Sequence, residues 1–172
     1  MIRISKSLIV NCSLKTKSEA LVEVIKKFSD CTVIQYNDVP NCYRVEAGID
    51  AVVISGSGAR IVDPSDRRLF EGVVNLIKTC DLPVLGICFG QQLLCWAFGA
   101  KVGSLAKPVL DRFEAVRVVD NDGLFAGFEK NRTVPLAENH YDYVLKEKPR
   151  RVRFCSACGF GFMRNRGSQT QR

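Results

Sequence analysis

A cysteine between two glycines is the feature of this sequence with the clearest potential for chemistry. Cys88 stands in the run Gly-Ile-Cys-Phe-Gly-Gln-Gln, residues 86–92, directly after an apolar stretch that begins at Pro83. The stretch 83–87 predicts a buried strand, and the residues after Cys88 predict a helix that ends at Gly99. A side chain at such a junction lies at the carboxyl end of the sheet, where α/β folds bind ligands. The pattern therefore favours a nucleophilic thiol over a buried structural cysteine.

The helix predicted after Cys88 shapes the chemistry of its thiol. Free backbone amides and the positive end of the helix dipole point at the sulfur there, which favours the thiolate over the thiol. The N–H of Phe89 is also placed to stabilise an oxyanion. Glycines on either side let the backbone turn tightly and leave the sulfur accessible. We therefore expect Cys88 to act as a nucleophile.

The surrounding segments predict the frame that positions Cys88. Apolar runs predict strands at 8–10, 31–36, 51–55 and 83–87, and further strands at 100–105, 114–119 and 132–137. Helical periodicity covers 17–28 and a second helix capped by Ser65, while 120–123 indicates a turn and 124–128 a short helical or loop piece. Strands that are apolar throughout are typical of parallel sheets covered on both faces. We predict an α/β fold of the flavodoxin-like type: a mostly parallel open sheet with helices on both faces.

Charge and composition narrow the classes of function. The net charge is +7, but residues 150–172 contain six arginines and no acid, so residues 1–149 carry a net charge of only +1. A body without a basic stripe argues against nucleic-acid binding. We expect a domain over 1–149 and a divergent, poorly ordered basic tail over 150–172.

Eight cysteines raise the question of disulfides or a metal site. Six of them are scattered at irregular spacings, and the pair Cys155 and Cys158 has no second pair to complete four ligands. The sequence shows no secretory signal and no apolar run long enough to cross a bilayer. We expect a cytoplasmic protein with reduced cysteines, no metal, no cofactor and no membrane partner.

The cysteine motif resembles the nucleophile region of class I (triad) glutamine amidotransferases, with the glutaminase domain or subunit of GMP synthases as the nearest type. The similarity covers residues 83–94 and 98–103 and spans roughly 7–149 in all. The resemblance implies that Cys88 attacks the side-chain amide of glutamine, forms a thioester and releases ammonia. It also implies that the partner, which uses this ammonia, is an ATP-dependent synthetase subunit.

Further site residues follow from the same resemblance. Gly56, Ser57 and Gly58 resemble the family's Ser-Gly-Gly-Pro loop, which supplies an oxyanion amide alongside that of Phe89, although serine and glycine replace its second glycine and its proline. Gln92 matches the family glutamine that holds the substrate. The segment with Asn139, His140, Tyr141 and Asp142 resembles Ser-His-x-Asp, near the amino-acid end of the substrate, with asparagine in place of serine.

One part of the family pattern is not found in this sequence. The family takes its base from a His-Pro-Glu motif, whereas His140 is the single histidine here. The loss of pattern at 147–153 suggests a truncated or frame-shifted end. His140 is therefore either a substitute base or a substrate-side residue, and we favour the second.

The main alternative to a glutaminase is an impaired protein that binds glutamine or a partner without turnover. A different cysteine hydrolase on the same type of sheet is a third possibility.

Overall fold

A six-stranded sheet forms the larger layer of the protein. The computed structural model describes residues 6–15, 19–118, 127–145, 152–155 and 160–163, the last two ranges by their backbone alone. The sheet has the order β2-β1-β3-β4-β8-β7. The strands are β1 (Lys6–Asn11), β2 (Asp30–Gln35), β3 (Ala51–Ile54), β4 (Val84–Ile87), β7 (Val152–Cys155) and β8 (Phe160–Met163). The first four run parallel, β8 pairs antiparallel with β4, and β7 pairs antiparallel with β8.

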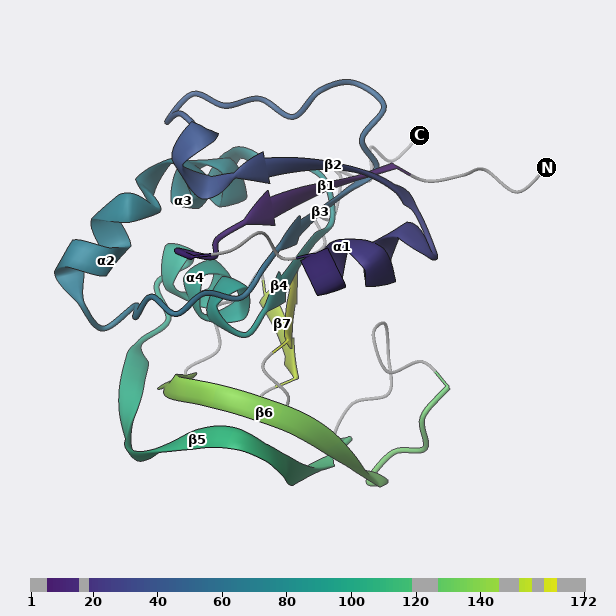
Figure 1. Cartoon of the computed structure of the whole chain (residues 1–172), viewed down its shortest axis with the longest axis vertical. Helices are drawn as coiled ribbons and strands as arrows, with labels where there is room; N and C mark the ends of the chain where they lie inside the picture. Colours follow the sequence, from purple (N-terminus) through teal and green to yellow (C-terminus); the bar gives the residue numbers. More distant parts are fainter. Residues whose placement is uncertain (1–5, 16–18, 119–126, 146–151, 156–159, 164–172) are drawn as a thin grey trace, which may run out of the picture.

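Helical crossovers connect β1 to β2 and β3 to β4, whereas the connection from β2 to β3 is a loop with a short 3-10 turn (Figure 1). The helices are α1 (Glu19–Lys26), α2 (Pro64–Leu69), α3 (Glu71–Thr79) and α4 (Phe89–Ala97), and a short 3-10 turn, η1 (Tyr36–Asp38), follows β2. In the sheet order, the crossover through α1 leads from β1 to β2, at one edge of the sheet. The crossover through α2 and α3 leads in the opposite direction, from β3 to β4. Because such crossovers are right-handed, α1 and α3 cover opposite faces of the sheet. The expectation of a mostly parallel sheet with helices on both faces is confirmed.

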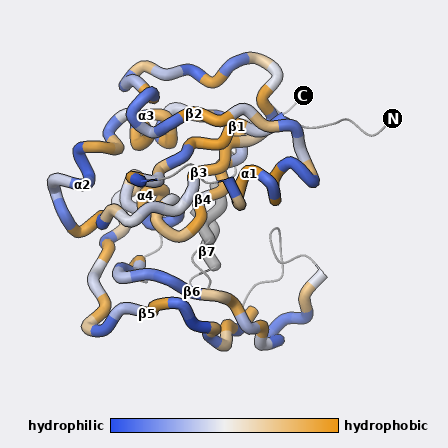
Figure 2. The backbone as a smooth tube through the Cα atoms, in the orientation of Figure 1, coloured by the Kyte–Doolittle hydropathy of each residue, from blue (hydrophilic) through white to orange (hydrophobic). Residues whose placement is uncertain are grey.

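The hydrophobic core lies between the sheet and the helices that follow β3 and β4. Alternate residues of the central strands face it, among them Val10 and Ile54, which are fully buried. They pack in one cluster with Val73 of α3 and Leu93 of α4. Figure 2 shows the central strands as a mainly apolar band. This packing fixes α4, and with it the residue at its amino end, against the sheet.

A separate two-stranded ribbon lies beside the sheet layer. β5 (Val102–Arg117) pairs antiparallel with β6 (Thr133–Val144), and the ribbon runs across the lower part of Figure 1. The sequence predicts two strands at 100–105 and 114–119, but the structure has one long strand there. Register shifts between Ser104 and Arg112 explain the difference, because bulges let the strand continue past Pro108. β6 also extends through residues 138–144.

Two other expectations differ from the structure. Asp63, rather than Ser65, caps the helix after β3: its carboxylate accepts the backbone N–H of Ser65 at 2.8 Å. That helix is divided into α2 and α3 at Phe70. Within residues 150–172, the structure describes β7 and β8 at the edge of the sheet, and the expected order of the tail as a whole stays a prediction. Most of the expected turn and loop piece at 120–128 lies outside the described residues. In the described ranges, no helix is both long and apolar enough to cross a bilayer.

Candidate active site

Cys88 occupies a sharp turn between β4 and α4. Its backbone has φ 51° and ψ −109°, and it stands at the N-cap of α4. A positive φ at a residue other than glycine is strained and costs about 1–3 kcal/mol. Such strain is characteristic of nucleophile elbows, where it lifts the reactive side chain above the end of the strand. The backbone thus confirms the strand, turn and helix predicted around Cys88.

The glycines two residues before and two residues after Cys88 make this turn possible. A Cβ at Gly90 would lie 2.3 Å from the carbonyl oxygen of Ile54, and a Cβ at Gly86 would lie 2.6 Å from the backbone of Gly90. Both distances are far below van der Waals contact. The amino end of α4 therefore rests directly on the backbone of β3 and β4, and only glycine fits at these two positions.

The sulfur of Cys88 is partly buried and faces β6. Its S–H donates to the backbone oxygen of Asn139 at 3.6 Å. Burial raises the pKa of the Cys88 thiol, the backbone N–H of Phe89 lowers it, and the negative charge of Glu138 raises it again, with a net rise. The sequence-based expectation that the helix end favours the thiolate is therefore wrong on balance. The helix amide acts as expected, but burial beside β6 and a nearby carboxylate outweigh it.

The loop after β3 passes close to the elbow. A Cβ at Gly56 would lie 3.7 Å from the Cβ of Cys88, so the two backbones are in close proximity. The Ser57 hydroxyl accepts the backbone N–H of Ala59 at 3.1 Å and stabilises the turn. A Cβ at Gly58 would meet nothing within 4 Å. The structure thus brings the predicted oxyanion loop to Cys88, and the role of its amides stays a prediction.

Gln92 joins α4 to β6. Its side-chain Nε2 donates to the backbone oxygen of Asp142 at 3.0 Å, and this contact is buried. The His140 Nδ1 lies 3.0 Å from the same oxygen. The Asp142 carbonyl is therefore a junction between the helix that carries Cys88 and the strand that carries the predicted substrate residues.

His140 forms a close pair with Glu138. The His140 Nε2 lies 2.8 Å from Oε2 of Glu138, and only 24% of the His140 side chain and 12% of the Glu138 side chain are exposed. Both ring nitrogens of His140 are thus occupied, one by the Asp142 carbonyl and one by Glu138. In this arrangement neither nitrogen is free to accept the thiol proton, which agrees with our preference for a role other than direct base.

The carboxylate of Asp142 is held by Arg60, which comes from the loop after β3. The Arg60 guanidinium donates to Oδ1 of Asp142 at 2.6 Å and to the hydroxyl of Ser104 on β5 at 2.7 Å. Asp142 is buried. This cluster connects the sheet layer to both strands of the ribbon.

The five predicted substrate-side residues divide into two groups. Gln92, His140 and Asp142 lie in the interface between α4 and β6, whereas the side chains of Asn139 and Tyr141 are exposed. The Asn139 side chain donates to Asp111, and the Tyr141 ring lies 5.8 Å from the Arg60 guanidinium carbon. This division follows from the alternation of side chains along β6.

Sequence reasoning did not find Glu138 or Arg60. Glu138, His140 and Asp142 recur at every second position, which in a strand places them on one face. That spacing is the signal that could have identified Glu138, had the segment been assigned to a strand. Arg60 carried no comparable signal, because its partner is 82 residues away in the chain.

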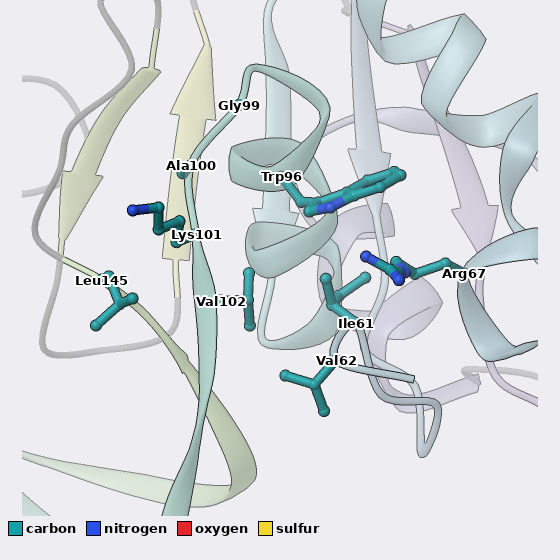
Figure 3. A pocket seen from close by; sticks show the side chains of 9 residues that line it. All are labelled: Ile61, Val62, Arg67, Trp96, Gly99, Ala100, Lys101, Val102 and Leu145. Atoms are coloured by element: carbon teal, nitrogen blue, oxygen red, sulfur yellow. The ribbon is translucent and has the colours of Figure 1, made fainter. Parts of the chain in front are cut away.

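A surface pocket of about 490 Å³ lies at the opposite end of α4 from Cys88 (Figure 3). Trp96 forms one of its walls, and the Arg67 guanidinium carbon lies 5.4 Å from the centre of the Trp96 ring. None of the predicted site residues lines this pocket. This pocket is therefore separate from the predicted site residues around Cys88.

Comparison with known proteins defines the class. The family model for class I glutamine amidotransferases matches residues 8–164, which is most of the chain. The chain therefore belongs to the class I glutamine amidotransferase family. Among curated relatives, it is 32% identical over 131 residues to one subunit of the glutamine-hydrolyzing GMP synthase of Methanopyrus kandleri, an alignment that covers 74% of this chain and 66% of the relative. It is 32% identical over 122 residues to the corresponding subunit from Thermoplasma acidophilum, covering 71% of this chain and 58% of the relative.

Other relatives are much longer than the region they share with this chain. The glutamine-hydrolyzing GMP synthase of Pyrobaculum aerophilum is 31% identical over 105 residues, which cover 59% of this chain but 18% of that protein. Among solved structures, a GMP synthase subunit from Thermoplasma acidophilum superposes with a TM-score of 0.72 at 23% identity, covering 89% of this chain and 72% of that one. A glutamine amidotransferase from Thermotoga maritima gives 0.69 at 18% identity, with 94% and 72% coverage. These superpositions support the fold.

Proposed function

We propose that this protein is a glutaminase subunit, which hydrolyses glutamine through a thioester on Cys88. The observation that carries the proposal is the strained Cys88 at the start of α4, with the Phe89 N–H at its sulfur and the loop at Gly56 beside it. A thiol in this position has the N–H of Phe89 on one side, as a donor to an oxyanion, and the backbone of the loop at Gly56 on the other. That arrangement suits attack on an amide carbon.

The proposed reaction uses the site residues as follows. The Cys88 sulfur bonds to the amide carbon of the glutamine side chain, and the carbonyl oxygen takes up negative charge beside the N–H of Phe89 and the loop at 56–58. The C–N bond then breaks, and the leaving nitrogen takes a proton to depart as ammonia. Water attacks the thioester, releasing glutamate and restoring the thiol. The amino-acid end of the substrate binds on the side of Gln92 and residues 139–142. There the side chains of Asn139 and Tyr141 are exposed, and the hydrogen bonds of Gln92, His140 and Asp142 hold β6 against α4.

We further propose that ammonia passes to an ATP-dependent synthetase partner of the GMP synthase type. Two relatives are named as one subunit of a glutamine-hydrolyzing GMP synthase. In the part of the chain up to residue 145 that the structure describes, the six cysteines are free thiols, which supports a reducing, cytoplasmic setting.

The direct test is glutamate formation from glutamine by the purified chain, alone and with the ATP-dependent component of a two-component GMP synthase. Cys88→Ala should abolish glutamate formation, and Cys42→Ala, which alters an exposed cysteine outside the site, should not. In the coupled assay, GMP should form with glutamine as the nitrogen donor. Absence of glutamate in both settings, together with no labelling of Cys88 by a chloroketone analogue of glutamine, would refute the proposal.

A second candidate is glutamine or partner binding without turnover. It is favoured by the raised pKa of the Cys88 thiol and by the donation of its S–H to the Asn139 carbonyl, since both oppose the thiolate. Its signature is saturable glutamine binding that Cys88→Ala leaves unchanged, with no glutamate produced. Calorimetry with glutamine, run beside the glutamate assay, separates the two candidates.

A further inference from the structure

The pair formed by Glu138 and His140 carries chemistry that the proposed function does not yet use. Both residues project from β6 on the same side, one on each side of Asn139 along the strand. The backbone oxygen of Asn139 is the group that accepts the S–H of Cys88. The imidazole and the carboxylate therefore flank the point where β6 meets the nucleophile.

The hydrogen bonds of His140 fix where the protons of this pair lie. A backbone carbonyl can only accept, so the Nδ1 that faces the Asp142 carbonyl carries a hydrogen. The opposite nitrogen, Nε2, lies 2.8 Å from Oε2 of Glu138, and one further proton lies between these two atoms. The imidazole and the carboxylate therefore share this proton in one short hydrogen bond.

The second carboxylate oxygen of Glu138 is the unusual feature of the site. Oε1 is buried, and none of the residues that the structure describes gives it a hydrogen bond. A buried carboxylate oxygen without a donor is costly, so its presence calls for a donor that arrives with the reaction. Glu138 directly precedes Asn139, whose backbone oxygen accepts the S–H of Cys88, so it stands beside the position where β6 meets the thiol. Its charge also raises the pKa of that thiol.

We propose that Glu138 is the general base and acid of this site, and that His140 is the residue that positions it. This inference rests on the proposed glutaminase function. The thiol proton of Cys88 moves to Oε1 of Glu138 as the sulfur bonds to the amide carbon. The same proton then moves to the leaving nitrogen as the C–N bond breaks, so that the carboxylate is restored. During the step, His140 stays hydrogen-bonded to Oε2 and to the Asp142 carbonyl, and so keeps Oε1 of Glu138 in place.

Glu138→Gln is the decisive variant, because it keeps the shape of the side chain and removes its basicity and its charge. We expect glutamine hydrolysis to fall about 100-fold or more, the range typical of the loss of general acid–base catalysis. Alkylation of Cys88 by iodoacetamide should instead become faster at neutral pH, because the charge that raises the pKa of the thiol is gone. A purely structural role for Glu138 would not move the two rates in opposite directions.

His140→Gln tests the positioning role. We expect it to lower kcat for glutamine hydrolysis more than it raises KM, and to leave Cys88 accessible to the chloroketone analogue of glutamine. The matched control is Glu114→Gln, which makes the same chemical change on β5 of the ribbon, at an exposed residue paired with Arg112. This control should hydrolyse glutamine at the wild-type rate.

The outcomes separate the inference from the function on which it rests. If the wild type hydrolyses glutamine and Glu138→Gln stays within about threefold of it, Glu138 is not the base, while the glutaminase function stands. If glutamine protects Cys88 from the chloroketone but no hydrolysis occurs, the site binds substrate and the proposed proton transfer is absent. If neither labelling nor hydrolysis is seen, the glutaminase function itself is wrong.

Discussion

The guanidinium of Arg60 donates to the buried carboxylate of Asp142 at 2.6 Å and joins the loop after β3 to the strand β6. Arg60 also donates to Ser104 on the neighbouring strand, so one side chain connects the sheet layer to both strands of the ribbon. The carbonyl of Asp142 in turn accepts the amide of Gln92 from α4. The position of β6 beside Cys88 therefore depends on hydrogen bonds of Arg60, Asp142 and Gln92, none of which forms a bond or transfers a proton in the proposed reaction.

The first prediction concerns this connection. Arg60→Ala leaves the Asp142 carboxylate buried without its partner, so the melting temperature should fall. Asp142→Asn should lower it as well, and the double variant should lose less than the two single losses together, because the residues act as a pair. Thermal unfolding followed by circular dichroism measures all three. Arg112→Ala, which breaks an exposed ion pair on β5, is the control and should have little effect. Additive losses in the double variant would show that the pair is not coupled.

A second prediction addresses the packing beneath the nucleophile. Gly90→Ala places a Cβ 2.3 Å from the carbonyl oxygen of Ile54, so α4 must shift away from β3. We expect a loss of about 1–3 kcal/mol in the free energy of unfolding, as for other overpacked sites. Gly58→Ala is the matched control, since a Cβ there meets nothing within 4 Å. Urea denaturation of both variants gives the comparison, and equal stability of the two would contradict the close approach of α4 to the sheet.

The reactivity of Cys88 should depend on pH in a defined direction. Burial first, and the charge of Glu138 in addition, raise the pKa of the thiol, while the Phe89 N–H lowers it less. The thiolate fraction near neutral pH is therefore smaller than for a free cysteine, and the half-point of alkylation lies at higher pH. Mass spectrometry of the peptide that contains Cys88 after timed iodoacetamide treatment, with N-acetylcysteine as the reference thiol, measures this. A half-point below that of the reference would mean that the helix amides dominate.

Gln92 should be important for both stability and substrate binding. Gln92→Leu removes the buried donor to the Asp142 carbonyl and leaves that oxygen with one fewer partner. We expect a loss of about 1–3 kcal/mol in the free energy of unfolding, the usual effect of an unsatisfied buried polar group, with weaker glutamine binding. Gln91→Leu changes the neighbouring buried glutamine and serves as the control. Glutamine affinity from calorimetry should fall for the first variant and be retained in the second.

The strand, turn and helix around Cys88 could be predicted from the sequence, because each of these depends on residues that are close along the chain. The apolar run before Cys88, the glycines at 86 and 90 and the amphipathic residues after it act within a few positions of one another. The parallel direction of the first four strands was also predicted, since unbroken apolar strands joined by helices are typical of parallel sheets. Some local details were missed: Asp63 caps the helix in place of Ser65, and bulges keep β5 continuous where a break was expected.

The environment of the sulfur depends on the tertiary structure. The local pattern predicted a thiolate at a helix end, yet burial, a hydrogen bond to the Asn139 carbonyl and the charge of Glu138, about fifty residues further along the chain, oppose the thiolate. The pairing of β8 with β4 could not be predicted from local pattern either, because it joins segments more than seventy residues apart. The energies of burial and of charge interaction depend on distance in space, and no spacing along the sequence encodes that distance. For this reason the nucleophile could be found from the sequence, while the group proposed to take its proton could be found only in the fold.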